Sequence, residues 1–148
     1  MLFLAGWGKN LKKLSDAGLS YCTNCHNTAL FDLVELHRKV SLFLVPVAKW
    51  DSKFYKRCSI CDAGYELTEQ EKNTMLGLSM KLPSNIEIME IWNDIDKLCI
   101  DFLKTNQKPE DFNNYIDDKL SSKYNDGYIS YVLLFYKDNL ERSLEKNN

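Results

Sequence analysis

The sequence lacks any apolar stretch long enough to cross a membrane. Its longest apolar stretches, residues 41–48 and 129–136, hold about eight residues each, whereas a membrane helix requires about 20. Residues 1–7 are apolar, but they are too few for the hydrophobic region of a secretory signal, and no basic segment precedes them. We therefore expect a cytoplasmic protein without membrane contact, in a compartment where cysteine thiols stay reduced.

Recognisable catalytic patterns are also absent from the sequence. It has no glycine-rich phosphate-binding loop, and neither of its two histidines belongs to a nucleophile–histidine pattern. Acidic residues recur on the polar side of one expected helix, at Glu87, Glu90, Asp94 and Asp101. A metal site in a helical bundle also needs Glu-x-x-His pairs, and the chain has none, so we expect a solvated acidic row. The sequence indicates neither an enzyme nor a small-molecule substrate.

Clustered positive charge is missing as well. The net charge of −2 divides into +4 over residues 1–62 and −6 over residues 63–148. Four ionised thiols that bind one divalent cation would reduce the first value to about +2. That charge is well below what is typical of a dedicated nucleic-acid-binding domain.

Cysteine, in contrast, is present in two regularly spaced pairs. Cys22 and Cys25 form one Cys-x-x-Cys, Cys58 and Cys61 form another, and 32 residues separate the pairs. Each such turn brings two sulfurs and several backbone N–H groups together, and two turns provide the tetrahedral set of four thiolates that zinc accepts. We predict one structural zinc ion at these four residues. Since protein supplies all four ligands, no coordination position remains for catalysis.

Strand patterns surround the two cysteine pairs. The predicted segments are a strand over 2–8, a loop over 9–18, two strands within 28–47 that turn near 37–39, and a strand over 53–57. They predict an antiparallel β zinc ribbon as the first part of an α+β protein. We place this zinc-ribbon domain at residues 1–67.

Helical patterns begin at Thr68. The capping-box pattern occurs at Thr68–Glu71 and again at Ser84–Glu87. Pro109, followed by two acidic residues, starts a further helix, and residues 125–127 break it before a last one. We predict a small C-terminal α-helical bundle of about four helices over residues 68–148. The second helix is expected to bury Ile88, Ile91, Trp92, Ile95, Leu98, Cys99 and Phe102, with Cys99 as an unreactive thiol.

Several segments of the first half together resemble a known family. Gly6-Trp-Gly-Lys9, the two cysteine pairs, the apolar residues 40–48 and the segment 58–67 resemble the zinc-ribbon family of short proteins with unassigned function, which has a rubredoxin-like set of four cysteines. The resemblance covers residues 1–72. It implies the ribbon fold and the four cysteine ligands, and nothing catalytic. The helical half has no such resemblance.

The cysteine spacing also resembles the iron site of rubredoxin. Rubredoxins usually have glycine where His26 and Asp62 stand in this chain, so zinc is favoured over iron. The polar or small residues after each second cysteine, His26-Asn27 and Asp62-Ala63-Gly64, suit the tight, partly left-handed backbone that these turns need. His26 adjoins a ligand, and we expect it to be exposed to solvent rather than bound to the metal.

Two groups of residues outside the cysteine pairs are candidates for binding a partner. The first is a basic, aromatic-flanked set that could bind phosphate or single-stranded nucleic acid or could be an ordinary solvated hairpin face: His37, Arg38, Lys39, Lys49, Lys53, Lys56 and Arg57, with Trp50 or Phe54 stacking. The second is Tyr128, Tyr131 and Tyr136, near one side of the last helix. These tyrosines form either an exposed patch for a partner or part of the helical core.

Three hypotheses for function follow from the sequence. The favoured one is a protein-interaction adaptor in which the ribbon is a rigid platform and the helices are the docking surface. The second is an accessory factor that binds nucleic acid or nucleoprotein through the basic ribbon. The third, which requires iron in place of zinc, is a rubredoxin-like electron carrier.

Overall fold

The chain divides into two compact units, which are described separately below. The computed structural model describes the backbone of residues 2–3, 11–42 and 45–147 and the side chains of residues 11–37 and 52–147. The first unit is Met1–Leu82 and the second is Pro83–Asn148; we call them the sheet unit and the helical unit. Together they confirm the α+β class, with an antiparallel sheet followed by helices.

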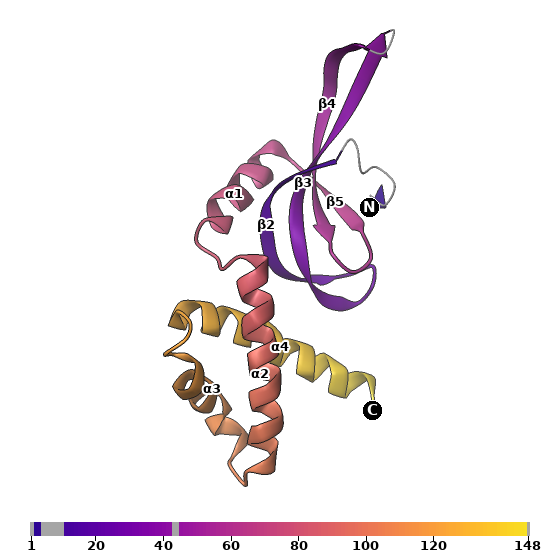
Figure 1. The fold of residues 1–148 in the computed structure, drawn as a ribbon. Helices are drawn as coiled ribbons and strands as arrows, with labels where there is room; N and C mark the ends of the chain where they lie inside the picture. The colour runs from indigo at the N-terminus through magenta and orange to yellow at the C-terminus, as the bar shows by residue number, and fades with distance from the viewer. Residues whose placement is uncertain (1, 4–10, 43–44, 148) are drawn as a thin grey trace. The chain divides into compact units, whose positions relative to one another are not determined.

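The described part of the sheet unit contains five antiparallel strands. In chain order they are β1 (Leu2–Phe3), β2 (Leu11–Cys22), β3 (Asn27–Leu42), β4 (Val45–Cys58) and β5 (Ala63–Leu67). Their order across the sheet is β1-β5-β4-β3-β2, and β3 and β4 form a long hairpin (Figure 1).

Two strand predictions were wrong. The loop predicted over 9–18 is part of β2 from Leu11 onward, and residues 9–10 lie outside the described residues. The turn predicted near residues 37–39 is absent from the described backbone, because β3 continues to Leu42. The predicted strand over 2–8 is described only as β1, Leu2–Phe3.

Small apolar clusters lie on both faces of the sheet. One consists of Val34, Leu36 and Tyr55, with Leu11 packed against it. The other surrounds the cysteines and contains Cys22, Ala29, Phe31 and Cys58 as its buried members. Because adjacent residues of a strand point to opposite faces, alternate positions of β3 supply the two clusters.

Helix α1 (Glu69–Ser79) belongs to the sheet unit. Thr68 and Glu71 form the predicted capping box, and the helix packs against β2 and β5. The Lys72 ammonium lies 4.2 Å from the centre of the Phe54 ring. The division between the units therefore follows Leu82, whereas the predicted domain boundary followed residue 67. The capping box marked where a helix begins, but not which core that helix would join.

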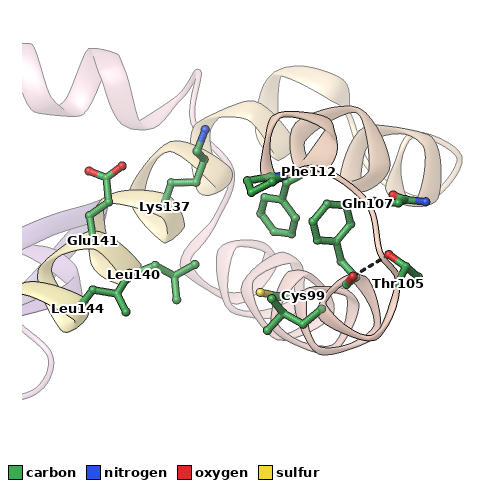
Figure 2. Close-up of a pocket in the computed structure, with 11 residues that line it drawn as sticks. Cys99, Thr105, Gln107, Phe112, Lys137, Leu140, Glu141 and Leu144 are labelled. Atoms are coloured by element: carbon green, nitrogen blue, oxygen red, sulfur yellow. Dashed lines mark hydrogen bonds between the residues drawn. The ribbon is translucent and has the colours of Figure 1, made fainter. Parts of the chain in front are cut away.

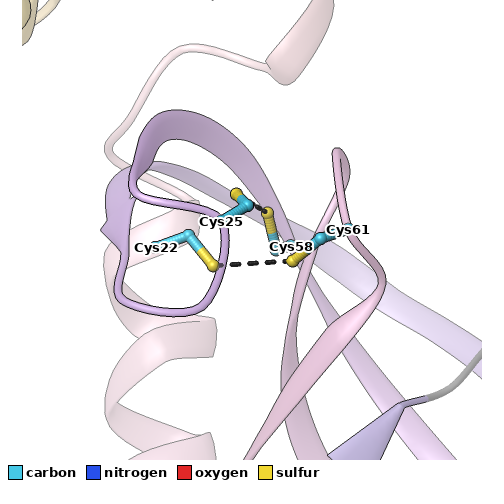
Figure 3. Close-up of side chains that lie close together, drawn as sticks. All are labelled: Cys22, Cys25, Cys58 and Cys61. Carbon is cyan, nitrogen blue, oxygen red and sulfur yellow. Dashed lines mark hydrogen bonds between the residues drawn. The ribbon is translucent and has the colours of Figure 1, made fainter.

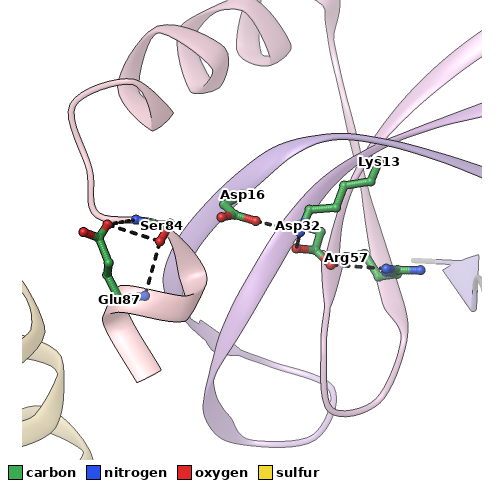
Figure 4. Close-up of polar contacts among 6 residues, drawn as sticks. All are labelled: Lys13, Asp16, Asp32, Arg57, Ser84 and Glu87. Atoms are coloured by element: carbon green, nitrogen blue, oxygen red, sulfur yellow. Dashed lines mark hydrogen bonds and ion pairs between the residues drawn. The ribbon is translucent and has the colours of Figure 1, made fainter. Parts of the chain in front are cut away.

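The helical unit contains α2 (Asn85–Lys104), the 3₁₀ turn η1 (Pro109–Asp111), α3 (Phe112–Leu120) and α4 (Asp126–Lys146). The predicted capping box at Ser84 and Glu87 begins α2 (Figure 4). The core comprises Ile88, Ile91, Ile95 and Phe102 from α2, Phe112, Ile116 and Leu120 from α3, and Ile129, Val132, Leu133 and Tyr136 from α4. Among the described helices, none combines the length and the apolar character needed to cross a membrane.

Tyrosines join the later helices to α2. Tyr136 is buried, its ring packs edge-on against Trp92 at 5.0 Å, and its hydroxyl donates to Asp96 Oδ1 at 2.7 Å. The surface-patch alternative is therefore wrong for Tyr136, and Tyr128 and Tyr131 are half-buried. The predicted solvation of the acidic row also fails at one position, because the Asp94 carboxylate accepts hydrogen bonds from Lys123 and Tyr124.

Candidate metal centre

The structure brings the four predicted metal ligands together. Cys22 ends β2 and Cys58 ends β4, while Cys25 and Cys61 lie in the turns that follow these two strands. Figure 3 shows the four side chains converging from the two turns. Their sulfurs all lie within 4.8 Å of one another.

Two of the distances between these sulfurs match those of a tetrahedral metal site. Cys22 Sγ and Cys61 Sγ are 3.7 Å apart, and Cys25 Sγ and Cys58 Sγ are 3.9 Å apart. Four sulfurs placed about 2.3 Å from one zinc ion would be separated from each other by about 3.8 Å. All four cysteines are free of disulfides, and a disulfide would need a separation of about 2.05 Å. The cluster can therefore hold one metal ion.

The backbones of the two turns follow one pattern. The N–H of His26 donates to the Cys22 carbonyl at 2.9 Å, and the N–H of Asp62 donates to the Cys58 carbonyl at 3.1 Å. Both donors have a positive φ, 56° for His26 and 57° for Asp62. The predicted left-handed backbone is thus confirmed at both positions. Histidine and aspartate adopt this conformation more readily than most other residues with a side chain do.

His26 is exposed, as the sequence predicted. Its Nδ1 lies 3.2 Å from the Tyr21 hydroxyl, with which it shares a hydrogen bond. Among the described residues, the group of atoms that could hold a metal ion consists of the four cysteine sulfurs and does not include the His26 ring.

Burial and hydrogen bonding act in opposite directions on the buried thiols. Burial raises the pKa of Cys22, but the Tyr65 hydroxyl and the backbone N–H groups of Cys25 and Asn24 outweigh it and lower the pKa to about 6. Burial raises the pKa of Cys58 to about 12, although the N–H groups of Cys61 and Ile60 oppose it. Four thiolates of which two, at Cys22 and Cys58, are buried therefore need a cation to balance their charge.

Residues around the sulfurs help to fix their positions. The Tyr65 hydroxyl lies 3.3 Å from Cys22 Sγ and 3.0 Å from Thr23 Oγ1, with a hydrogen bond to each. The Asn24 side-chain amide donates to Cys61 Sγ at 3.4 Å. Polar groups of this kind orient ligands and stabilise their negative charge. The sequence analysis assigned no role to Asn24 or Tyr65. Their positions were the available signals: Asn24 lies inside the first Cys-x-x-Cys, and Tyr65 follows the second one by four residues.

The predicted basic face does not form a single surface among its described members. Arg57 donates to Asp32 at 3.2 Å, and the Lys13 ammonium lies 3.0 Å from the same carboxylate (Figure 4). Lys56 points to the opposite face of β4, where it contacts the Phe31 ring at 4.8 Å.

Two further members of that basic set already have partners. Lys53 pairs with Glu66 at 3.4 Å. His37 is buried between Glu35, at 3.4 Å, and Ser52, at 3.3 Å. The side chains of Arg38, Lys39, Lys49 and Trp50 lie outside the described residues.

Comparisons with known proteins complete this description. No protein-family model, no curated protein and no solved structure matches the chain. The resemblance to zinc ribbons therefore stays a prediction, and the four converging cysteines are its structural support.

Proposed function

We propose that this chain is a structural zinc-ribbon protein of the cytoplasm, and that it acts as a protein-interaction adaptor. In this proposal the zinc ion holds the sheet unit together and performs no chemistry. The helical unit provides the surface that binds a protein partner.

One observation carries the proposal: four thiols from two matched turns converge at distances that fit a tetrahedral site. A metal bound by four cysteines has no open position for water or substrate, which favours a structural role. The two turns follow the ends of β2 and β4, so the metal would join strands that are far apart in the sequence.

The support for a protein partner lies in the helical unit. Ile86, Met89, Ile100, Leu103, Leu134 and Leu144 are all exposed there. Single exposed apolar residues are ordinary, whereas a contiguous apolar patch marks an interaction surface; we propose that some of these residues form such a patch.

Metal analysis and a visible spectrum test the metal. We expect one zinc ion per chain and a colourless protein. Iron with visible thiolate-to-iron absorption would replace the adaptor hypothesis with the electron-carrier one. A chain that folds equally well without any metal would contradict both.

Co-purification tests the adaptor role. The zinc-loaded full chain should retain a defined protein partner through washing at moderate salt. Partner retention that disappears after nuclease treatment would instead favour the nucleoprotein hypothesis.

A further inference from the structure

The four clustered cysteines differ in how far solvent can reach them. Cys22 and Cys58 are fully buried, with 0% of each residue exposed. Cys25 and Cys61, the second cysteine of each pair, are half-buried. Because a reagent in water attacks a sulfur only where it can reach it, Cys25 and Cys61 are the two candidates for chemical modification of the cluster.

A hydrogen bond distinguishes the two half-buried sulfurs. The Asn24 side-chain amide donates to Cys61 Sγ at 3.4 Å. Within the described part of the chain, the side-chain partner of Cys25 Sγ is Cys58 Sγ at 3.9 Å, and this sulfur has no proton to donate once both cysteines bind a metal as thiolates. A hydrogen bond to a thiolate stabilises its charge and has to be broken before the sulfur can attack. Cys61 is therefore the better protected of the two.

The two buried sulfurs also accept hydrogen bonds. In its thiolate form, Cys22 Sγ accepts from the Tyr65 hydroxyl, 3.3 Å away, and from backbone N–H groups of its own turn. Backbone N–H groups of the second turn donate to Cys58 Sγ. Of the four sulfurs, Cys25 Sγ is thus the one that combines partial exposure with the lack of a donor among the described residues.

We propose that Cys25 is the oxidation-sensitive ligand of this cluster, at which a peroxide attacks and thereby releases the metal. The inference rests on the proposed structural zinc site, and it adds a response to oxidants that the presence of four cysteines does not by itself specify.

The reaction takes place in two steps. The Cys25 thiolate attacks one oxygen of hydrogen peroxide, the O–O bond breaks, and a sulfenic acid and one hydroxide ion result. The Cys58 thiolate, whose sulfur lies 3.9 Å away, then attacks the Cys25 sulfur; an S–S bond forms, the S–O bond breaks and a second hydroxide leaves. The two sulfurs together lose two electrons, which reduce the peroxide. Only two thiolates then remain to hold the metal, and its affinity falls accordingly.

Oxidation of this kind acts on one unit of the protein. The four cysteines lie at and after the ends of β2 and β4 in the sheet unit, and the helical unit contains none of them. Thiols can reduce a disulfide again, so the response is reversible when zinc is present. The sheet unit would therefore respond to oxidising conditions while the helical unit keeps its core.

The fifth cysteine must be removed before the test. Cys99 lies in the helical unit and lines a pocket there together with Phe112 and Leu140 (Figure 2). It is half-buried and free, so it could form disulfides with the oxidised thiols of another molecule. The experiment therefore uses the zinc-loaded full chain with Cys99→Ser.

The first measurement follows the metal and the disulfide together. Hydrogen peroxide is added to this protein, zinc release is monitored with a chromogenic chelator, and disulfides are mapped by mass spectrometry of peptides. We expect zinc release and the Cys25–Cys58 disulfide to appear at the same rate, and a thiol reductant with added zinc to reverse both. A first disulfide of any other composition, or zinc release without a disulfide, would overturn the proposal.

A second measurement ranks the half-buried sulfurs directly. A limiting amount of N-ethylmaleimide should label Cys25 roughly tenfold faster than Cys61, the effect expected of one hydrogen bond to a charged group. Asn24→Leu keeps the size of the side chain but removes the donor, so it should bring the Cys61 rate close to the Cys25 rate. Thr23→Val in the same turn is the matched control, because Thr23 is exposed and its hydroxyl bonds to that of Tyr65; it should leave the Cys61 rate unchanged.

The remaining outcomes separate this inference from the proposed function. Equal labelling of Cys25 and Cys61 in the chain with Asn24 intact would overturn the inference, and this comparison holds even if Asn24→Leu fails to bind zinc. An unchanged Cys61 rate in a zinc-loaded Asn24→Leu protein would also overturn it. If the chain holds one zinc ion that peroxide does not release, the inference fails and the structural role of the zinc stands. A chain that binds no metal would contradict the proposed function, and the inference with it.

Discussion

His26 and Asp62 occupy equivalent positions, 36 residues apart, in two separate turns. Each follows the second cysteine of its pair, has a left-handed backbone and donates its N–H to the carbonyl of the cysteine four residues earlier. A side chain at such a position costs roughly 1–2 kcal/mol in backbone strain, with Asn and Asp the best tolerated. The convergence of the four cysteines thus depends on two backbone conformations that most residues resist.

Substitution of Asp62 should reveal this dependence. Asp62→Gly should leave the thermal stability of the zinc-loaded protein equal or higher, because glycine adopts a positive φ without a steric cost. Asp62→Val should lower stability by about 1–2 kcal/mol, since valine is strained there. Thermal unfolding and zinc competition with a chelator measure both effects.

The control for the two Asp62 substitutions is Ser59→Val in the same turn. Ser59 is exposed and is not among the described positive-φ residues, so valine should be tolerated. Equal destabilisation by valine at 59 and 62 would contradict the backbone explanation.

Loss of one ligand should release the metal. A structural site of four cysteines contributes apparent binding free energy of about 10–16 kcal/mol at neutral pH, so Cys58→Ser should unfold the sheet unit. Elemental analysis should find far less than one zinc per chain. Cys99→Ser is the matched control, because this cysteine belongs to the helical unit, and it should keep its zinc. A Cys58→Ser protein with full metal content would refute the site.

Chelation should separate the two units. The core of α2, α3 and α4 contains none of the four clustered cysteines, so metal removal should spare most of the helical circular dichroism at 222 nm. The near-ultraviolet signals of the sheet unit should be lost. Collapse of both signals in one cooperative step would show that the units fold as one.

The Asp94–Lys123 pair should make the helical unit sensitive to acid. The hydrogen bond from Lys123 lowers the pKa of Asp94, partial burial opposes this, and the Tyr124 hydroxyl lowers it further. Because the folded pKa lies below the unfolded value of about 3.9, the pair stabilises fully above about pH 5 and is lost as pH falls through the folded pKa. Asp94→Asn should therefore cost about 1 kcal/mol or less at pH 7, and this difference should shrink below about pH 4.

Urea unfolding followed at 222 nm measures this effect. Glu90→Gln on the same helix is the control, because Glu90 is exposed and its replacement should change little at any pH. A difference between Asp94→Asn and the parent chain that grows as pH falls would have the wrong sign for this mechanism.

Sequence patterns predicted the features that depend on local chemistry. The capping boxes at Thr68 and Ser84 and the buried face of α2 at Ile88, Ile91 and Ile95 are confirmed, and the two cysteine pairs converge as a shared metal site would require. Each capping box, each Cys-x-x-Cys turn and the apolar face of α2 is determined by residues close together in the sequence, so periodicity and spacing are sufficient to identify it; the meeting of the two cysteine turns depends on strand pairing and was predicted from the chemistry of a four-thiolate site.

Features that depend on distant pairing were missed. Strand β2 has register shifts between Lys13 and Ser15 and between Asp16 and Gly18, which disrupt the alternation by which a strand is recognised. His37 sits at another shift in β3, opposite Ser52, so its polarity suggested a turn. For Tyr136 the sequence left an exposed patch and the helical core open; the structure places it in the core, where its hydroxyl reaches Asp96, forty residues earlier in the chain.

The irregularity of β2 has a consequence for how the protein behaves at high concentration. In the order β1-β5-β4-β3-β2 of the described strands, β2 comes last, and the last strand of a sheet is where another chain can pair with it. Its two bulges interrupt such pairing, and the exposed Lys12 and Lys13 would lose hydration if a second strand were added. The bulges that hide β2 from sequence patterns therefore also hinder edge-to-edge aggregation of the sheet.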